Sequence, residues 1–290
     1  MKTLAWHGLR QHVEEKNMAA AVTVVILARN EEQVIERAIS SVHWADEVIV
    51  VDSESTDKTV TLAQQAGATV IVQPWLGFVA QKQVGVKAAR NNWIFSLDAD
   101  EIVMDDLAMS ICAAMSAQPD PQDGYVIRRD EEFLGRIMPS MRRRSKAESF
   151  VRLYNRLFSD WNPTLIVHEE IVCPGRTIPL AGRMLHWRNY TIGKQLDTLN
   201  RNADLEGGLI ASQASTRKIL FGMAVKPLLR FAWIYLACGS YRVGIRGFIW
   251  AGLHAFAEFL RHAKAWEARM IVPQIHPPAD IYPAAVRRAA

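Results

Sequence analysis

The stretch Trp93-Ile94-Phe95-Ser96-Leu97-Asp98-Ala99-Asp100-Glu101 decides the fold that the sequence predicts. An apolar run of strand length ends in carboxylates, which is how α/β proteins present acidic groups at the carboxyl edge of a sheet. Because side chains alternate along an extended chain, we expect Asp98 and Asp100 to point the same way. Two neighbouring carboxylates repel each other, and a hard divalent cation such as Mg²⁺ is the usual compensation. The stretch therefore predicts a cation site, with a helix cap by Asp98 as the alternative.

Composition limits the classes of protein that the chain can represent. With 290 residues and 50% hydrophobic content, it can bury a full core and form one large domain or one domain with an appendage. A net charge of +4 is too small to predict nucleic acid as a partner. The three cysteines form no CxxC pair, so we interpret them as reduced thiols of a cytoplasmic protein. Residues 1–20 lack the apolar run of a secretory signal, and we interpret them as an N-terminal extension.

From residue 21 the sequence alternates between strand and helix patterns. Strands are predicted at residues 22–27, 48–51, 69–72 and 93–97, and helices at residues 59–66, 78–89 and around Ile35, Ile39 and Val42. Asn30 is the predicted cap of the helix around Ile35. Alternating strands and helices imply an α/β fold with a mostly parallel sheet, whose ligands bind beyond the carboxyl ends of the strands.

Polar side chains stand at three of these strand ends. Asn30, Asp52 and Asp98 would meet at one edge of the sheet, where they would form a pocket for a metal-bound nucleotide. Neither a GxGxxG after the first strand nor a GxxxxGK[ST] occurs in the sequence. This counts against a dinucleotide oxidoreductase and against a P-loop enzyme.

Four motifs follow one another along this region. They are Ala28-Arg29-Asn30-Glu31-Glu32, Val51-Asp52-Ser53-Glu54-Ser55-Thr56-Asp57, Trp75 followed by Gln81-Lys82-Gln83, and Leu97-Asp98-Ala99-Asp100-Glu101. In this order and spacing they resemble the motifs of family 2 glycosyltransferases with the GT-A fold. Within that family the chain is most similar to the lipopolysaccharide core biosynthesis glucosyltransferase-like branch, from about Val22 to Glu267. The resemblance implies a Rossmann-like nucleotide-binding sheet followed by C-terminal amphipathic helices.

The resemblance also implies roles for individual residues in binding the sugar donor. The donor-binding residues would be Asn30, Glu32, Asp52, Lys82, Asp98 and Asp100. Asp52 matches the acidic residue that hydrogen-bonds the uracil or ribose, and Asp98 and Asp100 match the Asp-x-Asp that holds the ribose and the metal, Mg²⁺ or Mn²⁺. A solvated helix face remains the alternative for Lys82. Arg29 and Gln83 depart from the aromatic residue and the Asn that are common in the family.

Residues 21–120 would then form the nucleotide-sugar half of the domain and residues 121–190 the acceptor half. His168 and Glu169 resemble the characteristic pair of the branch. This implies Glu169 as the base that removes the acceptor proton in an inverting reaction, and His168 as a diphosphate or metal contact. His186 is a further candidate pocket residue. The competing carboxylates are Glu170, Asp130, Glu131 and Glu132.

The C-terminal part has a different composition. Glu258 is the only acidic residue between Arg217 and Lys264, among many aromatic and aliphatic side chains. We find no run of about 20 largely uncharged residues, which a transmembrane helix needs. Residues 191–268 are therefore predicted to form amphipathic helices at the membrane interface, with ordinary core packing as the alternative. Residues 269–290 would be a loose tail.

The basic run Arg142-Arg143-Arg144 lies in a predicted loop. A solvated surface is one interpretation, and contact with a phosphorylated acceptor or anionic lipid is the other.

Together with the family resemblance, these patterns predict a cytoplasmic enzyme associated peripherally with the inner membrane. The resemblance implies that it moves one hexose from a UDP-glucose-like donor to a lipopolysaccharide core or related glycolipid acceptor. The sequence lacks the QxxRW motif, which is the signature of processive synthases, and this agrees with the addition of a single sugar. The alternatives are a polyprenyl-phosphate glycosyltransferase and a catalytically silent, membrane-docked protein that binds nucleotide sugar.

Overall fold

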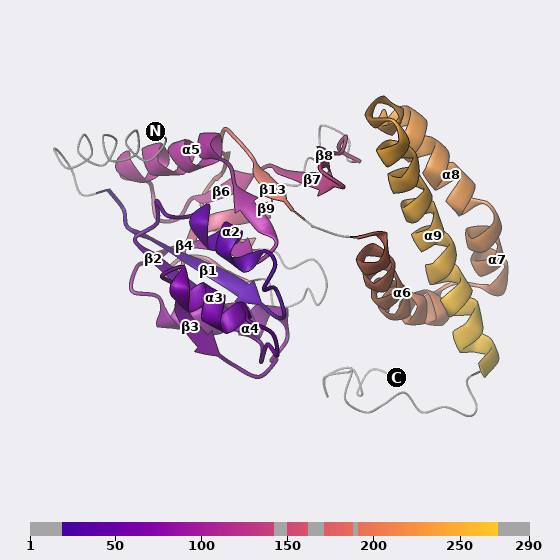
Figure 1. Cartoon of the computed structure of the whole chain (residues 1–290), viewed down its shortest axis with the longest axis horizontal. Coiled ribbons are helices and arrows are strands. Elements are labelled where there is room, and N and C mark those ends of the chain that lie inside the picture. The colour runs from indigo at the N-terminus through magenta and orange to yellow at the C-terminus, as the bar shows by residue number, and fades with distance from the viewer. Residues whose placement is uncertain (1–18, 142–149, 162–170, 188–190, 272–290) are drawn as a thin grey trace. The chain divides into compact units, whose positions relative to one another are not determined.

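The computed structural model describes residues 19–141, 150–161, 171–187 and 191–271 (Figure 1). Internal contacts divide the chain into two units. Unit 1 comprises Met1–Glu132 and Arg142–Asn189, and unit 2 comprises Phe133–Met141 and Tyr190–Ala290.

Unit 1 is built on a seven-stranded sheet in the order β12-β6-β9-β4-β1-β2-β3. Its strands are β1 (Val22–Ala28), β2 (Glu47–Asp52), β3 (Thr69–Val72), β4 (Trp93–Asp98), β6 (Gly124–Ile127), β9 (Phe150–Asn155) and β12 (Thr177–Pro179). The four strands β4-β1-β2-β3 are parallel, whereas β9 runs antiparallel to both β4 and β6. The sheet is therefore mostly parallel, as the sequence predicts.

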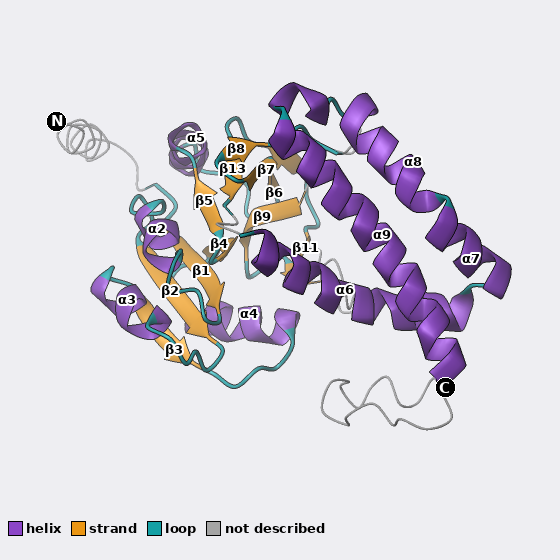
Figure 2. Cartoon of the chain, turned by 45° about the vertical axis from the view of Figure 1, so that its right-hand side comes forward, coloured by secondary structure: helices purple, strands orange, loops and turns teal. Residues whose placement is uncertain are grey.

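Helices cover both faces of this sheet. They are α2 (Ile35–Ser40), α3 (Thr59–Gln65), α4 (Phe78–Ala88) and α5 (Asp105–Ser116). One core cluster joins alternate residues of β1 and β4 to α2, α3 and α5, and the other joins the opposite face to α4. Figure 2 shows α3 and α4 on opposite sides of β1 and β2. The strands β1, β2 and β4 are largely buried on both faces, which explains why they read as continuous apolar runs.

A smaller sheet brings distant segments together beside the end of β4. Its order is β5-β13-β7-β8, from β5 (Glu101–Val103), β7 (Arg129–Phe133), β8 (Arg136–Ile137) and β13 (Met184–His186). In this register His186 lies opposite Glu101 on one neighbouring strand and Glu131 on the other. A further pair consists of β10 (Asp160–Trp161) and β11 (Ile171–Val172).

Unit 2 is helical. Its elements are α6 (Ile192–Gln213), α7 (Thr216–Ala224), α8 (Lys226–Ala232), the π-helix η2 (Trp233–Ala237), the 3₁₀-helix η3 (Ser240–Val243) and α9 (Ile245–Ile271). The long helix α9 packs against α6, α7 and α8. The hydrophobic core of unit 2 includes Phe133, Leu199, Ile234 and Trp250.

Two predictions about local structure are wrong. Asn30 does not cap the helix α2, because Val34 occupies the N-cap position. Asn30 instead has a positive φ of 55°, and its side-chain oxygen accepts a hydrogen bond from Thr56 N–H at 2.8 Å. The helical segment Thr216–Ala237 is long and apolar enough to cross a membrane, contrary to our reading of the sequence. That criterion concerns length and composition alone, and the core helix of a soluble protein also meets it.

Candidate active site

The loops that follow β1 and β2 interlock at the carboxyl edge of the sheet. Asp52, the last residue of β2, is fully buried, and its carboxylate accepts hydrogen bonds from the backbone N–H (2.8 Å) and hydroxyl of Ser55. The Ser55 hydroxyl oxygen also accepts Asn30 N–H at 2.8 Å. Because Asn30 in turn binds Thr56, the two strand ends hold Asn30 and Asp52 side by side.

Glu32 belongs to the outer part of the same junction. Its carboxylate accepts Lys58 N–H at 3.1 Å, and its own N–H donates to Asp57 at 3.1 Å. Hydrogen bonds from Thr59 and Glu32 outweigh the effect of burial and lower the pKa of Asp57. Glu32 is exposed, so it can meet a ligand that reaches this edge.

The helix α4 brings two buried polar side chains to the ends of the sheet strands, Gln81 beside the end of β2 and Lys82 beside the end of β4. Gln81 donates to the Ser53 hydroxyl at 3.1 Å and to the Gln73 carbonyl at 3.0 Å, which ties the loop after β3 to β2. Lys82 is only 7% exposed, so the alternative of a solvated helix face is wrong. Its Nζ lies 3.8 Å from Asp98 Oδ1 and 4.8 Å from the centre of the Trp161 ring.

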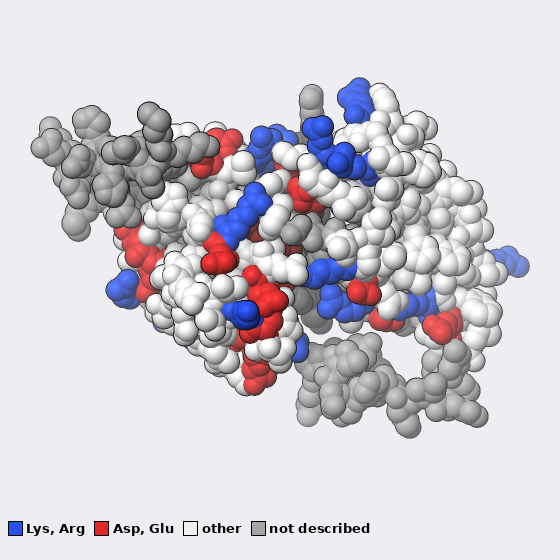
Figure 3. All heavy atoms as spheres, in the orientation of Figure 1, with Lys and Arg blue, Asp and Glu red and all other residues white. Residues whose placement is uncertain are grey.

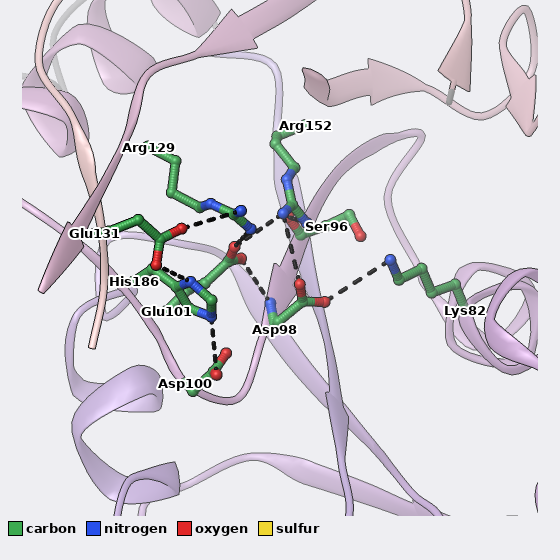
Figure 4. Close-up of polar contacts among 9 residues, drawn as sticks. All are labelled: Lys82, Ser96, Asp98, Asp100, Glu101, Arg129, Glu131, Arg152 and His186. Carbon is green, nitrogen blue, oxygen red and sulfur yellow. Dashed lines mark hydrogen bonds and ion pairs between the residues drawn. The ribbon is translucent and has the colours of Figure 1, made fainter. Parts of the chain in front are cut away.

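Asp98 and Asp100 do not point the same way, because β4 ends at Asp98 and the chain turns at Ala99 and Asp100. Figure 4 shows the Asp98 carboxylate turned toward Lys82 and Arg152 and the Asp100 carboxylate turned toward His186. Asp98 Oδ2 is 3.5 Å from Arg152 Nη2, and Asp100 Oδ2 is 2.9 Å from His186 Nε2. Period-two alternation applies to an extended chain, and it fails where the strand stops.

Glu101 closes this turn. It is fully buried, and its Oε2 accepts Asp98 N–H at 3.0 Å. Its Oε1 accepts hydrogen bonds from Arg152 Nη2 at 2.9 Å and from Arg129 Nη1 at 3.2 Å. One carboxylate thus fixes the turn and two guanidinium groups from β7 and β9.

The charges around the turn shift two pKa values in opposite directions. Burial by itself would raise the pKa of Asp98, but the positive charges of Lys82 and Arg152 outweigh it and hold that pKa well below its usual range. The pKa of Glu101 is raised, because complete burial and the nearby Asp98 charge outweigh the attraction of Arg152. Asp98 is therefore an ionised carboxylate at neutral pH.

His186 joins two acidic side chains. Its Nδ1 lies 2.8 Å from Glu131 Oε2, opposite the contact with Asp100, and the ring is buried. Both carboxylates accept hydrogen bonds when ionised, so both ring nitrogens must then carry protons. Glu131 also pairs with Arg129 at 3.2 Å. Asp130, a competing carboxylate in our sequence analysis, instead pairs with Arg128 and Arg183.

Several predicted residues lie outside the described residues. They are His168, Glu169, Glu170 and the basic run Arg142–Arg144. Sequence reasoning missed Glu101, Arg129 and Arg152. For Arg152 a signal existed, because a cation between the apolar residues Val151 and Leu153 needs a partner if the segment is buried. Within the part of the chain that the structure describes, three or more His, Cys, Asp or Glu residues nowhere gather as metal ligands.

Comparison with known proteins identifies the class. A family model described as glycosyl transferase family 2 matches residues 23–169. An uncharacterized glycosyltransferase of Rickettsia bellii is 34% identical over 272 residues, which cover 85% of this chain and 86% of the relative. The chain belongs to glycosyl transferase family 2 and is a glycosyltransferase with a GT-A-like fold, which confirms the predicted family and fold class.

Two further comparisons concern proteins with named activities. The lipopolysaccharide core biosynthesis glycosyltransferase LpsC of Rhizobium meliloti is 27% identical over 252 residues, covering 85% of this chain and 92% of LpsC. A solved structure of glucosyl-3-phosphoglycerate synthase from Mycobacterium tuberculosis with Mn²⁺ and UDP matches with a TM-score of 0.33 and 24% identity. That match covers 39% of this chain and 44% of the solved chain.

Proposed function

We propose that this glycosyltransferase moves a hexose from a UDP-linked sugar to a hydroxyl of a lipopolysaccharide core or related glycolipid. The observation that carries the donor part is the gathering of Asp52, Lys82, Asp98 and Asp100 in unit 1 at the carboxyl ends of β2 and β4. Ligands of parallel α/β sheets bind at this edge. Similarity to LpsC over most of both chains supports the acceptor class.

In this proposal the strand ends recognise the nucleoside. Asp52 accepts a hydrogen bond from the uracil or the ribose, since a carboxylate has about four acceptor positions and Ser55 occupies two of them. Asn30 and Glu32 line the loop beside the base. Asp98 accepts from the ribose, and Lys82 offers its positive charge to the diphosphate.

Asp98 and Asp100 are the side chains that would hold Mg²⁺ or Mn²⁺, with the Asp98 carboxylate turning away from Lys82 and Arg152 to reach the same cation as Asp100. Two carboxylates suit a hard cation that completes its shell with substrate phosphates and water, so no third protein ligand is required. The contact between His186 and Asp100 fits an outer partner that orients a ligating carboxylate. When bound, the cation neutralises charge that develops on the nucleoside diphosphate leaving group.

Glu169 stays the predicted base and His168 the predicted diphosphate or metal contact, in an inverting transfer of a single sugar. Among the competing carboxylates, Glu131 accepts from His186 and Arg129, and Asp130 pairs with two arginines. These contacts leave both less suited to removing a proton, because a general base needs a free acceptor within reach of the hydroxyl.

We assign the enzyme to the inner face of the cytoplasmic membrane, where unit 2 would contact anionic lipid. Unit 2 exposes many large apolar side chains, and its apolar segments are accompanied by cations. A basic amphipathic helix with aromatic residues suits the membrane interface.

Calorimetric titration with UDP-, GDP-, CMP- and dTDP-linked sugars, with and without Mn²⁺, tests the donor part. We expect Mn²⁺-dependent binding of one UDP-sugar, abolished by Asp100→Ala and retained by Asp130→Asn. If Asp100→Ala binds UDP as tightly as the wild type with Mn²⁺ present, the metal role of Asp100 is wrong.

Transfer from the bound UDP-sugar to lipopolysaccharide core and to polyprenyl phosphate then separates the acceptor classes. Glu169→Gln should bind the donor normally and transfer at least about 100-fold more slowly. Turnover near the wild-type rate would exclude Glu169 as the base. Donor binding without transfer or hydrolysis would favour the catalytically silent alternative.

A further inference from the structure

The turn between α8 and α9 exposes an unusual amount of apolar surface. We call residues 227–248 the hairpin tip. Its exposed side chains include Leu228 (71%), Leu229 (60%), Leu236 (63%), Ile245 (68%) and Phe248 (50%). Single exposed apolar residues are normal, but several large ones within one short segment indicate a binding surface.

The charges of the hairpin tip identify what it binds. Residues 227–248 contain three arginines and neither lysine nor any acidic residue. Arg230 lies 5.2 Å from the Trp233 ring, Arg242 lies 5.4 Å from the Tyr241 ring, and Arg246 donates to a backbone carbonyl. Among the described residues none of the three forms an ion pair. Guanidinium groups without an acidic partner, two of them beside aromatic rings, match the phosphates of anionic lipids.

The charged side chains of α9 farther from the tip are arranged differently. There, Arg261 pairs with Glu206 at 2.8 Å, and Lys264 pairs with Asp204. Figure 3 shows acidic and basic side chains together over α6, and a largely uncharged surface over α7 and α8. The tip therefore differs from the part of α9 beside α6: two cations of α9 are paired there with acidic residues of α6, whereas the three arginines of the tip form no ion pair among the described residues.

The tip is also tightly closed. A Cβ at Gly247 would lie 1.8 Å from the carbonyl oxygen of Ser240, so only glycine fits there. Gly239 and Gly244 flank η3 with positive φ values of 82° and 68°. These features give the tip a defined shape before it meets a membrane.

The segment Thr216–Ala237 does not cross the bilayer alone. As a helix it is about 33 Å long, enough for a hydrocarbon core of about 30 Å. However, α9 packs along α7 and α8, and a Cβ at Gly222 would lie 1.9 Å from the His262 ring. Crossing would therefore carry Glu258, Arg261 and His262 into the hydrocarbon, which is costly.

We propose that the hairpin tip inserts into one leaflet of an anionic bilayer and does not span it. The apolar side chains enter the acyl region, and Arg230, Arg242 and Arg246 bind lipid phosphates. The part from Leu228 to Ala237 is about 15 Å long, which is about half the hydrocarbon thickness. This inference rests on the proposed membrane association. It adds which part of unit 2 enters the bilayer and how deeply that part inserts.

The test uses the full chain with its three cysteines replaced by serine and one new cysteine labelled with an environment-sensitive NBD dye. Leu236→Cys and Ile245→Cys place the dye on the tip, and Leu209→Cys places it on α6, where the side chain is also exposed. With vesicles of phosphatidylcholine and about 30% phosphatidylglycerol, the tip labels should shift to the blue and brighten several-fold. The Leu209 label should not change.

Flotation with the same vesicles measures the contribution of the tip. Because apolar insertion is not screened, we expect binding to persist in about 1 M NaCl. The double variant Leu236→Asp and Ile245→Asp should weaken binding at least about tenfold. The matched variant Leu205→Asp and Leu209→Asp on α6 should bind as the wild type. All four side chains are exposed, so the folds of both variants should survive, as circular dichroism can verify.

Each contrary result has a separate meaning. Release in about 1 M NaCl without a blue shift shows surface binding alone, which overturns insertion and leaves membrane association intact. Labels on Thr216 that become accessible from the vesicle interior show a spanning helix. A blue shift without vesicles shows a protein partner, either a second copy or residues 272–290. No binding to vesicles refutes the proposed membrane association itself, whereas calorimetric donor binding is independent of all these outcomes.

Discussion

Removal of Arg152 should destabilise unit 1 strongly. Its side chain is only 9% exposed and lies 2.9 Å from Glu101, which is fully buried. Breaking a buried ion pair costs about 3–5 kcal/mol, because the remaining charge is left without compensation. Arg129 still contacts Glu101 at 3.2 Å, so we expect Arg152→Met to lower the free energy of unfolding by about 3 kcal/mol, the lower end of that range.

Urea denaturation followed by tryptophan fluorescence measures this change as a midpoint shift of about 1 M. Glu101→Gln in the same background gives a double-mutant cycle, and we expect a coupling free energy of at least about 1 kcal/mol between Arg152 and Glu101. Arg176→Met is the control, because the Arg176 side chain is 77% exposed and the backbone N–H of residue 176, which the variant keeps, still donates to the buried Asp123 carboxylate at 2.8 Å. That variant should unfold at the wild-type midpoint. Additive effects of Arg152→Met and Glu101→Gln would refute the proposed pairing.

Two other variants test packing and protonation. Gly85→Ala should lower the free energy of unfolding by about 1–3 kcal/mol, because the new Cβ would lie 2.5 Å from Val25 and 2.9 Å from Val51. Gly252 on α9 has open space around it, so Gly252→Ala should raise the free energy of unfolding by about 0.5–1 kcal/mol in the same urea assay. Asp98→Asn should lower stability at pH 7, and the difference from the wild type should shrink as the pH falls below the usual Asp pKa of about 4. The sign follows because the folded-state pKa of Asp98 is lowered, so its contribution is present above the unfolded pKa and is lost as the carboxylate becomes protonated. A stability difference between Asp98→Asn and the wild type that does not change with pH would contradict this prediction.

The parallel half of the sheet could be predicted because each of its elements carries its own local signal. The strands β1, β2 and β4 are buried on both faces and read as apolar runs, and the predicted bounds of β3 agree with the structure. The helices α3 and α4 begin at the predicted residues, Thr59 and Phe78. Burial and periodicity are properties of short segments, so one sequence suffices to find them.

Local rules failed where a distant contact decided the structure. Asn30 satisfies the composition of a helix cap, but its side chain reaches Thr56 in the loop after β2. The alternation from Asp98 to Asp100 fails because Glu101, held by Arg152 from another strand, closes a turn there. Neither partner could be chosen from the sequence, because many loops and cations compete for the same contacts.

The contacts around this turn also show why a boundary near residue 120 does not divide the site. In unit 1, β9 lies between β4 and β6, so a strand of the predicted acceptor half completes the sheet of the nucleotide half. Arg152 and His186 come from that second half, and they hold Asp98 and Asp100 of the first half in place. The position of each carboxylate in the Asp-x-Asp pair therefore depends on residues that lie more than fifty positions further along the chain. The carboxylates of Asp100 and Glu131 are accordingly linked through one imidazole ring, since a change in the position of His186 alters both contacts at once.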